Sequence, residues 1–215
     1  MQIISHRGYW IDPREKNTEV AFRRSFESGY GTETDLRDWN GEVVISHDVP
    51  RVGTELMSFS AFLDLYREYD CDGALALNIK ADGLQGYIKA EIEKHALDNY
   101  YLFDMSIPDT VITRKSGLNY LSRRSDLEPE PVLLDAAKGL WLDEFDTEWI
   151  TPSGISEFLG KGKKVFVVSS ELHGRDPKNQ WAKLRGHTVT GSKELILCTD
   201  LPEQAEKYFR MEEKL

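Results

Sequence analysis

Two carboxylates one residue apart are the strongest candidates for chemistry in this chain. Glu33 and Asp35 lie in the short apolar run that begins at Gly31. On an extended segment, alternate side chains point to the same side, so both carboxylates can chelate one ion. Their oxygens suit a hard divalent cation.

Two histidines and two cations accompany these carboxylates. His6 and Arg7 end the first apolar run, His47 precedes Asp48, and Lys80 ends a later run. Histidine exchanges protons near neutral pH, so one imidazole can deprotonate an attacking hydroxyl while the other protonates a leaving alkoxide. A metal ion with Arg7 and Lys80 would neutralise the non-bridging oxygens of a phosphodiester. The set is therefore typical of a metal-assisted phosphodiester site.

The elements that must position these residues alternate along the chain. Eight short apolar runs are predicted strands: Gln2–Ile4, Gly31–Leu36, Ala74–Ile79, Tyr100–Phe103, Leu118–Leu121, Gly139–Leu142, Lys164–Val168 and Glu194–Cys198. The intervening segments repeat apolar residues at helical spacing, which indicates parallel β/α units.

Helix start and stop signals support these segments. Asn17–Thr18 precedes a segment that ends at Gly29, Ser106 is followed three residues later by Asp109, and Thr151–Pro152 opens a segment that ends at Gly160. We read these as helix caps.

Polar residues follow nearly all of the runs, and this favours a closed barrel over an open doubly wound sheet, because a barrel gathers strand ends into one ring. We therefore predict an α/β fold, a (β/α)8 TIM barrel. Asn40–Gly41 is a strong two-residue hairpin signal, so we expect a small β-hairpin after strand two. It would return His47 toward Glu33 and Asp35.

Composition sets the class of the protein. The 215 residues suit one domain, residues 1–215, and 40% hydrophobic with 30% charged residues is ordinary for a globular chain. The net charge of −10 opposes binding to nucleic acid or an anionic membrane. No run is long enough to span a membrane.

Two features predict the location. Cys71 and Cys198 are expected to be free thiols, as in a reducing compartment. His6 lies too near the start for a cleavable signal peptide to precede it, so a cytoplasmic location is expected.

The ordered residues resemble the glycerophosphodiester phosphodiesterase family. The resemblance rests on His6-Arg7-Gly8, Asn17-Thr18 with Ala21-Phe22, Gly29, Glu33-x-Asp35 and His47-Asp48, and later on Lys80. It covers the first quarter of the chain closely. It implies a TIM barrel, a Mg or Ca ion on Glu33 and Asp35, and a small phosphodiester as substrate.

The resemblance also implies roles for single residues and shows two departures. His6 and His47 become the catalytic acid and base, and Arg7 and Lys80 contact the phosphoryl oxygens. The family usually has an acidic third metal ligand where this chain has Asn78, which offers only a neutral oxygen. Lys16 stands where the family usually has Glu, which leaves open a departing group other than plain glycerol.

Further polar residues at strand ends are candidate substrate ligands. Asp104 and Asp143 end strands four and six and could replace the lost carboxylate, and the cluster after strand seven contains Glu171, His173 and Arg175.

The sequence thus predicts metal-dependent hydrolysis of a glycerophosphodiester, or of a related sugar or polyol phosphodiester, by two histidines. Two alternatives stay open. One is a phospholipase-D-like barrel that transfers the phosphoryl group intramolecularly and releases a cyclic phosphate. The other, motivated by Asn78, is a phosphodiester-binding protein without turnover.

Overall fold

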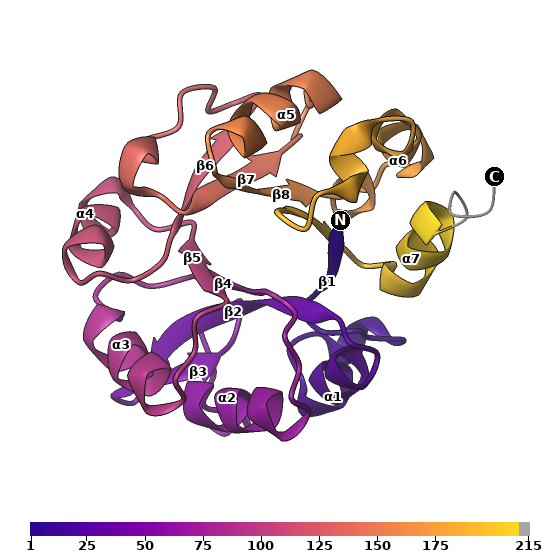
Figure 1. Cartoon of the computed structure of the whole chain (residues 1–215). Helices are drawn as coiled ribbons and strands as arrows, with labels where there is room; N and C mark the ends of the chain where they lie inside the picture. Colours follow the sequence, from indigo (N-terminus) through magenta and orange to yellow (C-terminus); the bar gives the residue numbers. More distant parts are fainter. Residues whose placement is uncertain (211–215) are drawn as a thin grey trace. The chain divides into compact units, whose positions relative to one another are not determined.

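The computed structural model describes residues 1–210 of the chain (Figure 1). They form two compact units. We call residues 6–120 the N-terminal unit, and residues 1–5 together with residues 121–210 the C-terminal unit. Each is described separately.

The N-terminal unit has a sheet of three parallel strands, in the order β5-β4-β2, with an antiparallel strand β3 paired to β2. Its elements are β2 (Gly31–Trp39), β3 (Glu42–Ile45), β4 (Leu75–Ile79), β5 (Tyr100–Phe103), α1 (Glu19–Glu27), α2 (Phe59–Glu68), α3 (Gln85–Lys94), α4 (Ile107–Lys115) and the 3-10 turn η1 (Pro13–Glu15). The buried faces of α1 and α2 meet through aromatic rings, with 4.8 Å between the ring centres of Phe22 and Phe62.

The C-terminal unit has five parallel strands in the order β1-β9-β8-β7-β6. Its elements are β1 (Gln2–His6), β6 (Leu121–Ser125), β7 (Gly139–Asp143), β8 (Lys164–Val168), β9 (Leu195–Thr199), α5 (Pro152–Gly160), α6 (Lys178–Arg185), α7 (Pro202–Arg210) and the 3-10 turns η2 (Leu134–Ala136), η3 (Ser170–His173) and η4 (Thr188–Gly191). Its core lies between the sheet and these helices, where Leu140, Leu142, Ile155 and Val165 are buried.

The predicted start signals of two helices are confirmed. The Ser106 hydroxyl accepts a hydrogen bond from the Asp109 N–H at 3.3 Å, and the Thr151 hydroxyl accepts one from the Gly154 N–H at 3.2 Å. Each satisfies a backbone donor that the first helical turn leaves without a partner.

The hairpin after β2 is also confirmed. Trp39 pairs with Glu42, so Asn40 and Gly41 make a two-residue turn with φ of 51° and 85°. Asparagine and glycine tolerate this left-handed backbone, which suits the twist of the two strands.

The prediction for the fifth run is wrong in position. We expected a strand at Leu118–Leu121, whereas β6 spans Leu121–Ser125. The true strand includes Arg123 and Arg124, whose charges hide it from a search for apolar runs. Both are tolerated because Arg123 pairs with Glu128 at 2.6 Å and Arg124 stacks on aromatic rings.

Within residues 1–210, the eight parallel strands and the helices that alternate with them define a (β/α)8 TIM-barrel fold, as predicted. One connection lacks an α-helix. Between β6 and β7 the chain has only η2, and Pro129 and Pro131 in this segment disfavour a helix. No helix in this described range is long and apolar enough to cross a membrane. Cys71 and Cys198 are free thiols, as expected.

Candidate active site

The chemically active side chains of the N-terminal unit gather where its strands end. The Arg7 N–H donates to the Glu33 carbonyl at 2.9 Å, which joins the His6–Arg7 segment to β2. Asp35 lies opposite Asn78 in the register of β2 and β4. The structure therefore brings the predicted metal ligands onto two neighbouring strands.

Three buried oxygens at this place have no hydrogen-bond partner. They are Oε2 of Glu33, Oδ1 of Asp35 and Oδ1 of Asn78. A buried polar atom left without a partner costs about 1 to 3 kcal/mol, so three such oxygens together indicate a site for a ligand. Two carboxylates and an amide oxygen fit a hard divalent cation. The described residues contain no cluster of three His, Cys, Asp or Glu donors, so Asn78 would have to complete the set.

The other oxygen of Asp35 is held by one ion pair and one hydrogen bond. Nε of Arg7 lies 2.9 Å from Oδ2, and the Asn17 amide donates to the same oxygen at 2.8 Å. Asn17 is itself fixed, because its own oxygen accepts from the Thr34 hydroxyl at 2.9 Å. Oδ1 accepts no hydrogen bond, and its one ion pair, with Lys80, is longer, at 3.4 Å.

Asn17 was not foreseen as a site residue. We expected it to cap α1, but the residue at the cap is Thr18, whose side chain makes no capping hydrogen bond. Asn17 instead adopts a left-handed backbone, with φ of 60°, and turns its amide toward Asp35. A positive φ is common for asparagine, so the residue type was the available signal.

Gly8 allows the chain to turn after His6 and Arg7. Its φ is 83°, and a Cβ atom there would lie 2.7 Å from the Cβ of Ala21 in α1. Only glycine fits this close approach without a shift of the backbone.

Burial raises the pKa of Glu33 well above its ordinary value, and the neighbouring Asp35 carboxylate raises it further. The cations Arg7 and Lys80 act in the opposite direction with smaller effect. Without a bound cation, Glu33 therefore tends to hold a proton, and a divalent ion would displace that proton.

His6 lies beside this carboxylate. Its Nε2 is 3.8 Å from Oε2 of Glu33, and its side chain is mostly buried. The imidazole therefore faces the group of unpartnered oxygens.

His47 follows β3 and is much more exposed than His6. The Ser46 N–H donates to the Asp35 carbonyl at 3.0 Å, and Arg37 donates to the His47 carbonyl at 3.1 Å, so the hairpin fixes this residue beside β2. Nδ1 of His47 lies 2.7 Å from Oδ1 of Asp48. Hydrogen bonding from His47 lowers the pKa of Asp48, which stays ionised and can only accept. Nδ1 therefore carries the hydrogen, and Nε2 remains available for proton transfer.

Lys80 and Asp104 lie at the same cluster. Nζ of Lys80 is 3.4 Å from Oδ1 of Asp35. Asp104 follows β5 with φ of 66°, and its charge adds to the rise in the pKa of Glu33. Both side chains are partly buried.

The remaining predicted substrate ligands belong to the C-terminal unit. Asp143 accepts from Nε2 of His173 at 2.5 Å. Glu171 accepts hydrogen bonds from Ser169, from Thr199 and from the Asp200 N–H.

Arg175 donates to the carbonyls of Glu144 and Phe145. These bonds hold the loops that follow β7, β8 and β9. The binding of substrate by Asp143, Glu171, His173 and Arg175 stays a prediction.

Comparison with known proteins shows similarity of structure only. No protein-family model matches the chain, and no curated protein matches its sequence. Among solved structures, a glycerophosphodiester phosphodiesterase from Parabacteroides distasonis has a TM-score of 0.68 at 18% identity, with 99% of this chain and 98% of that chain covered. A phosphodiesterase from Oleispira antarctica, in complex with its product sn-glycerol-3-phosphate, has a TM-score of 0.68 at 13% identity, with 98% and 97% covered.

A Ca-dependent phosphatidylinositol-specific phospholipase C from Streptomyces antibioticus has a TM-score of 0.59 at 11% identity, with 97% of this chain and 96% of that chain covered. At these identities the comparison shows a shared fold. The fold of this chain is thus that of glycerophosphodiester phosphodiesterases along nearly its whole length.

Proposed function

We propose that this protein hydrolyses a small glycerophosphodiester with the help of a divalent cation, Mg or Ca. The observation that carries the proposal is the group of three unpartnered buried oxygens on Glu33, Asp35 and Asn78 beside His6. The fold shared with glycerophosphodiester phosphodiesterases supports it, as does the phosphodiesterase that binds sn-glycerol-3-phosphate as its product.

Glu33, Asp35 and Asn78 would hold the cation. When bound, the cation supplies Lewis-acid stabilisation of the charge that develops on the phosphoryl oxygens. Asn17 and Arg7 keep Asp35 oriented for this task.

The side chains of the chain itself bind the phosphate and move the protons. Arg7 and Lys80 place positive charge beside Asp35, where they can contact the non-bridging oxygens. His6 and His47 act as the acid and base pair, one taking the proton of the attacking hydroxyl and the other giving a proton to the leaving alkoxide. Asp48 fixes the ring of His47.

The proposal is tested with glycerophosphocholine and the full-length protein, measuring release of glycerol 3-phosphate with added Mg or Ca and with chelator. We expect turnover that the chelator abolishes and that Asp35→Asn reduces by at least about 10². Glu130→Gln, a change at an exposed carboxylate, is the matched control and should leave the rate unchanged. Turnover unaffected by chelator would reject the proposal.

Intramolecular transfer is a second candidate for the same site. It is favoured by the likeness to the phosphatidylinositol-specific phospholipase C. A hydroxyl of the substrate would then attack the phosphorus, the bond to the other alcohol would break as that alcohol takes a proton from one histidine, and a cyclic phosphate would remain. Phosphorus NMR of the first product separates the two reactions, because a cyclic phosphodiester and an open phosphomonoester have distinct resonances.

A further inference from the structure

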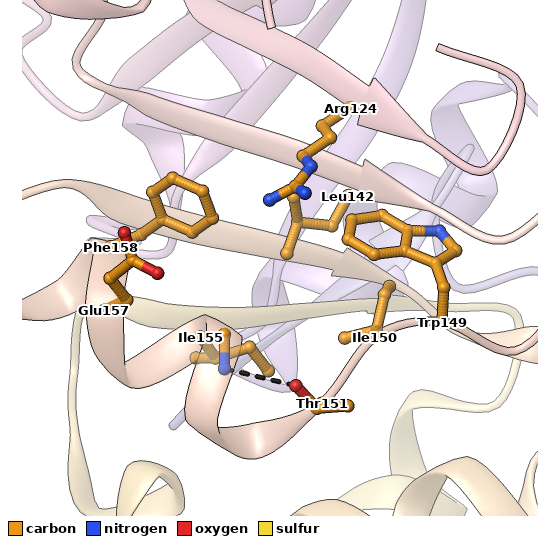
Figure 2. Close-up of a pocket in the computed structure, with 9 residues that line it drawn as sticks. Arg124, Leu142, Trp149, Ile150, Thr151, Ile155, Glu157 and Phe158 are labelled. Carbon is orange, nitrogen blue, oxygen red and sulfur yellow. Dashed lines mark hydrogen bonds between the residues drawn. The ribbon is translucent and has the colours of Figure 1, made fainter. Parts of the chain in front are cut away.

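A cavity of about 220 Å³ lies in the C-terminal unit, outside the residues of the candidate active site (Figure 2). It is lined by strands β6 and β7, the segment before α5, and α5 itself: Arg124, Leu142, Trp149, Ile150, Thr151, Gly154, Ile155, Glu157 and Phe158. The two strands that line it, β6 and β7, are joined by the one β/α connection of the described chain that has no α-helix.

The cavity opens on the face of β7 that packs against α5. Leu142 belongs to the core under this helix, whereas the next residue, Asp143, bonds to His173. Because side chains alternate along a strand, Asp143 points to the opposite face. The cavity is therefore separate from the polar residues that end β7.

Arg124 supplies a positive charge that no described residue neutralises by a hydrogen bond. Its guanidinium lies 4.9 Å from the ring centre of Trp149 and 5.8 Å from that of Phe158. Its Nε is buried and has no hydrogen-bond partner. Figure 2 shows the guanidinium between the two rings, directed into the space above Ile155. The rings hold its flat faces, so its N–H edge stays available for a ligand.

The walls of the cavity define what that ligand must be. An arginine edge pairs with a carboxylate or a phosphate through two parallel hydrogen bonds. Leu142, Ile150 and Ile155 are apolar and buried, and they suit a hydrocarbon group attached to the carboxylate. The volume is below the ~300 Å³ at which pockets for drug-sized ligands begin, so the ligand must be small.

Charge at the rim limits the ligand further. Glu157 is exposed there and bonds to Lys161 at 2.6 Å, which lowers the pKa of this carboxyl; the charge of Arg124 lowers it to a lesser degree. Lys161, 5.5 Å from the ring centre of Phe158, balances this carboxylate, so a dianion such as phosphate would meet only the one uncompensated charge of Arg124. A monoanion matches the single positive charge better.

We propose that this cavity binds a small organic monocarboxylate, with its carboxylate on Arg124 and its apolar group between Trp149 and Phe158. Its occupant would join β6, β7 and α5, and would stabilise the folded protein by mass action. The proposal does not depend on the catalytic activity.

Benzoate is a suitable probe, with benzamide as its uncharged analogue and inorganic phosphate as the competing anion. Titration calorimetry on the full-length protein should give saturable benzoate binding with a Kd of about 1 mM or tighter. Proton–nitrogen NMR spectra should show the indole N–H of Trp149 shifting with the same Kd. Benzamide and phosphate should bind at least about tenfold more weakly.

Variants assign the binding to the cavity. Arg124→Gln should weaken benzoate binding by at least about tenfold, since it removes the charged fork. Arg185→Gln, at an arginine stacked 4.8 Å from the ring of Tyr208, is the matched control and should bind as the wild type does. If Arg124→Gln does not fold, Trp149→Leu serves instead and should weaken binding several-fold. Absence of saturation up to about 10 mM, or equal binding of phosphate, would overturn the proposal.

Discussion

Replacing Asn78 by aspartate tests the metal site through its weakest donor. Asn78 is 8% exposed and lies opposite Asp35, so a new carboxylate would enter the group of unpartnered oxygens. At an effective dielectric constant of about 20, a unit charge about 4 Å from a divalent ion contributes ~8 kcal/mol of attraction. Without the ion the new carboxyl can hold a proton and so avoid repulsion from Glu33 and Asp35; giving that proton up on metal binding restores the repulsion, which at about 5 Å from each offsets ~6.6 kcal/mol of this.

The remaining ~1.4 kcal/mol corresponds to a Kd about tenfold tighter for the cation. In the metal-free Asn78→Asp protein the buried carboxyl holds a proton that the unfolded chain releases at neutral pH, so this variant should be less stable than the wild type, by about 1 to 3 kcal/mol. Addition of Ca should therefore raise its melting temperature more than it raises that of the wild type.

Calorimetric titration with Ca and thermal unfolding with and without chelator measure both effects. Asn179→Asp adds the same charge at an exposed position of α6 and is the control. An unchanged Kd for Ca in Asn78→Asp, with the control also unchanged, would place this residue outside the metal site and refute the reasoning.

Three further results are expected. His6→Ala and His47→Ala should each lower kcat by at least about 10², whereas His187→Ala should not; near-native turnover in either variant would remove that histidine from the mechanism. Asn17→Ala should weaken Ca binding measured by calorimetry by about tenfold, because Asp35 loses a donor that orients it; unchanged affinity would show that Arg7 alone suffices. In chelator, the free energy of unfolding should fall as pH rises above 4.5, because the raised pKa of Glu33 lets the native state hold a proton that the unfolded chain releases; Glu33→Gln should flatten this fall in urea titrations.

Local sequence signals predicted most of the fold. The caps at Ser106 and Thr151 and the turn at Asn40–Gly41 depend on residues close in sequence, and the structure forms all three. The strand β6 was misplaced because the environment that accepts Arg123 and Arg124 comes from Glu128 and from rings further along the chain. Apolar periodicity cannot register such partners.

In the candidate site, too, local rules predicted some residues correctly, whereas contacts between distant residues were missed. Glu33, Asp35 and His47 were placed together in advance, because alternation along a strand and a two-residue turn are local rules. The sequence predicts a helix cap at Asn17, since an asparagine at the start of a helix usually caps the backbone N–H groups there. Its actual partner, Asp35, is distant in sequence, and only the folded chain brings the two together.

The roles of the polar residues in the C-terminal unit depend on tertiary contacts, which no short sequence segment reveals. Glu171 and Arg175 have the right types to bind a substrate, but they hydrogen-bond to Thr199, Glu144 and the backbone of neighbouring loops. A polar residue after a strand can serve a loop as well as a ligand, and the choice depends on tertiary contacts.

The position of a bound metal ion tests the central claim most directly. Crystals of the full-length protein soaked in Mn, which replaces Mg or Ca on oxygen ligands and scatters anomalously, would locate it. We expect one strong peak within about 2.0 to 2.6 Å of Oε2 of Glu33, Oδ1 of Asp35 and Oδ1 of Asn78. A fully soaked crystal with no peak at these three oxygens, or with its peak at other residues, would contradict the metal-dependent phosphodiesterase proposed here.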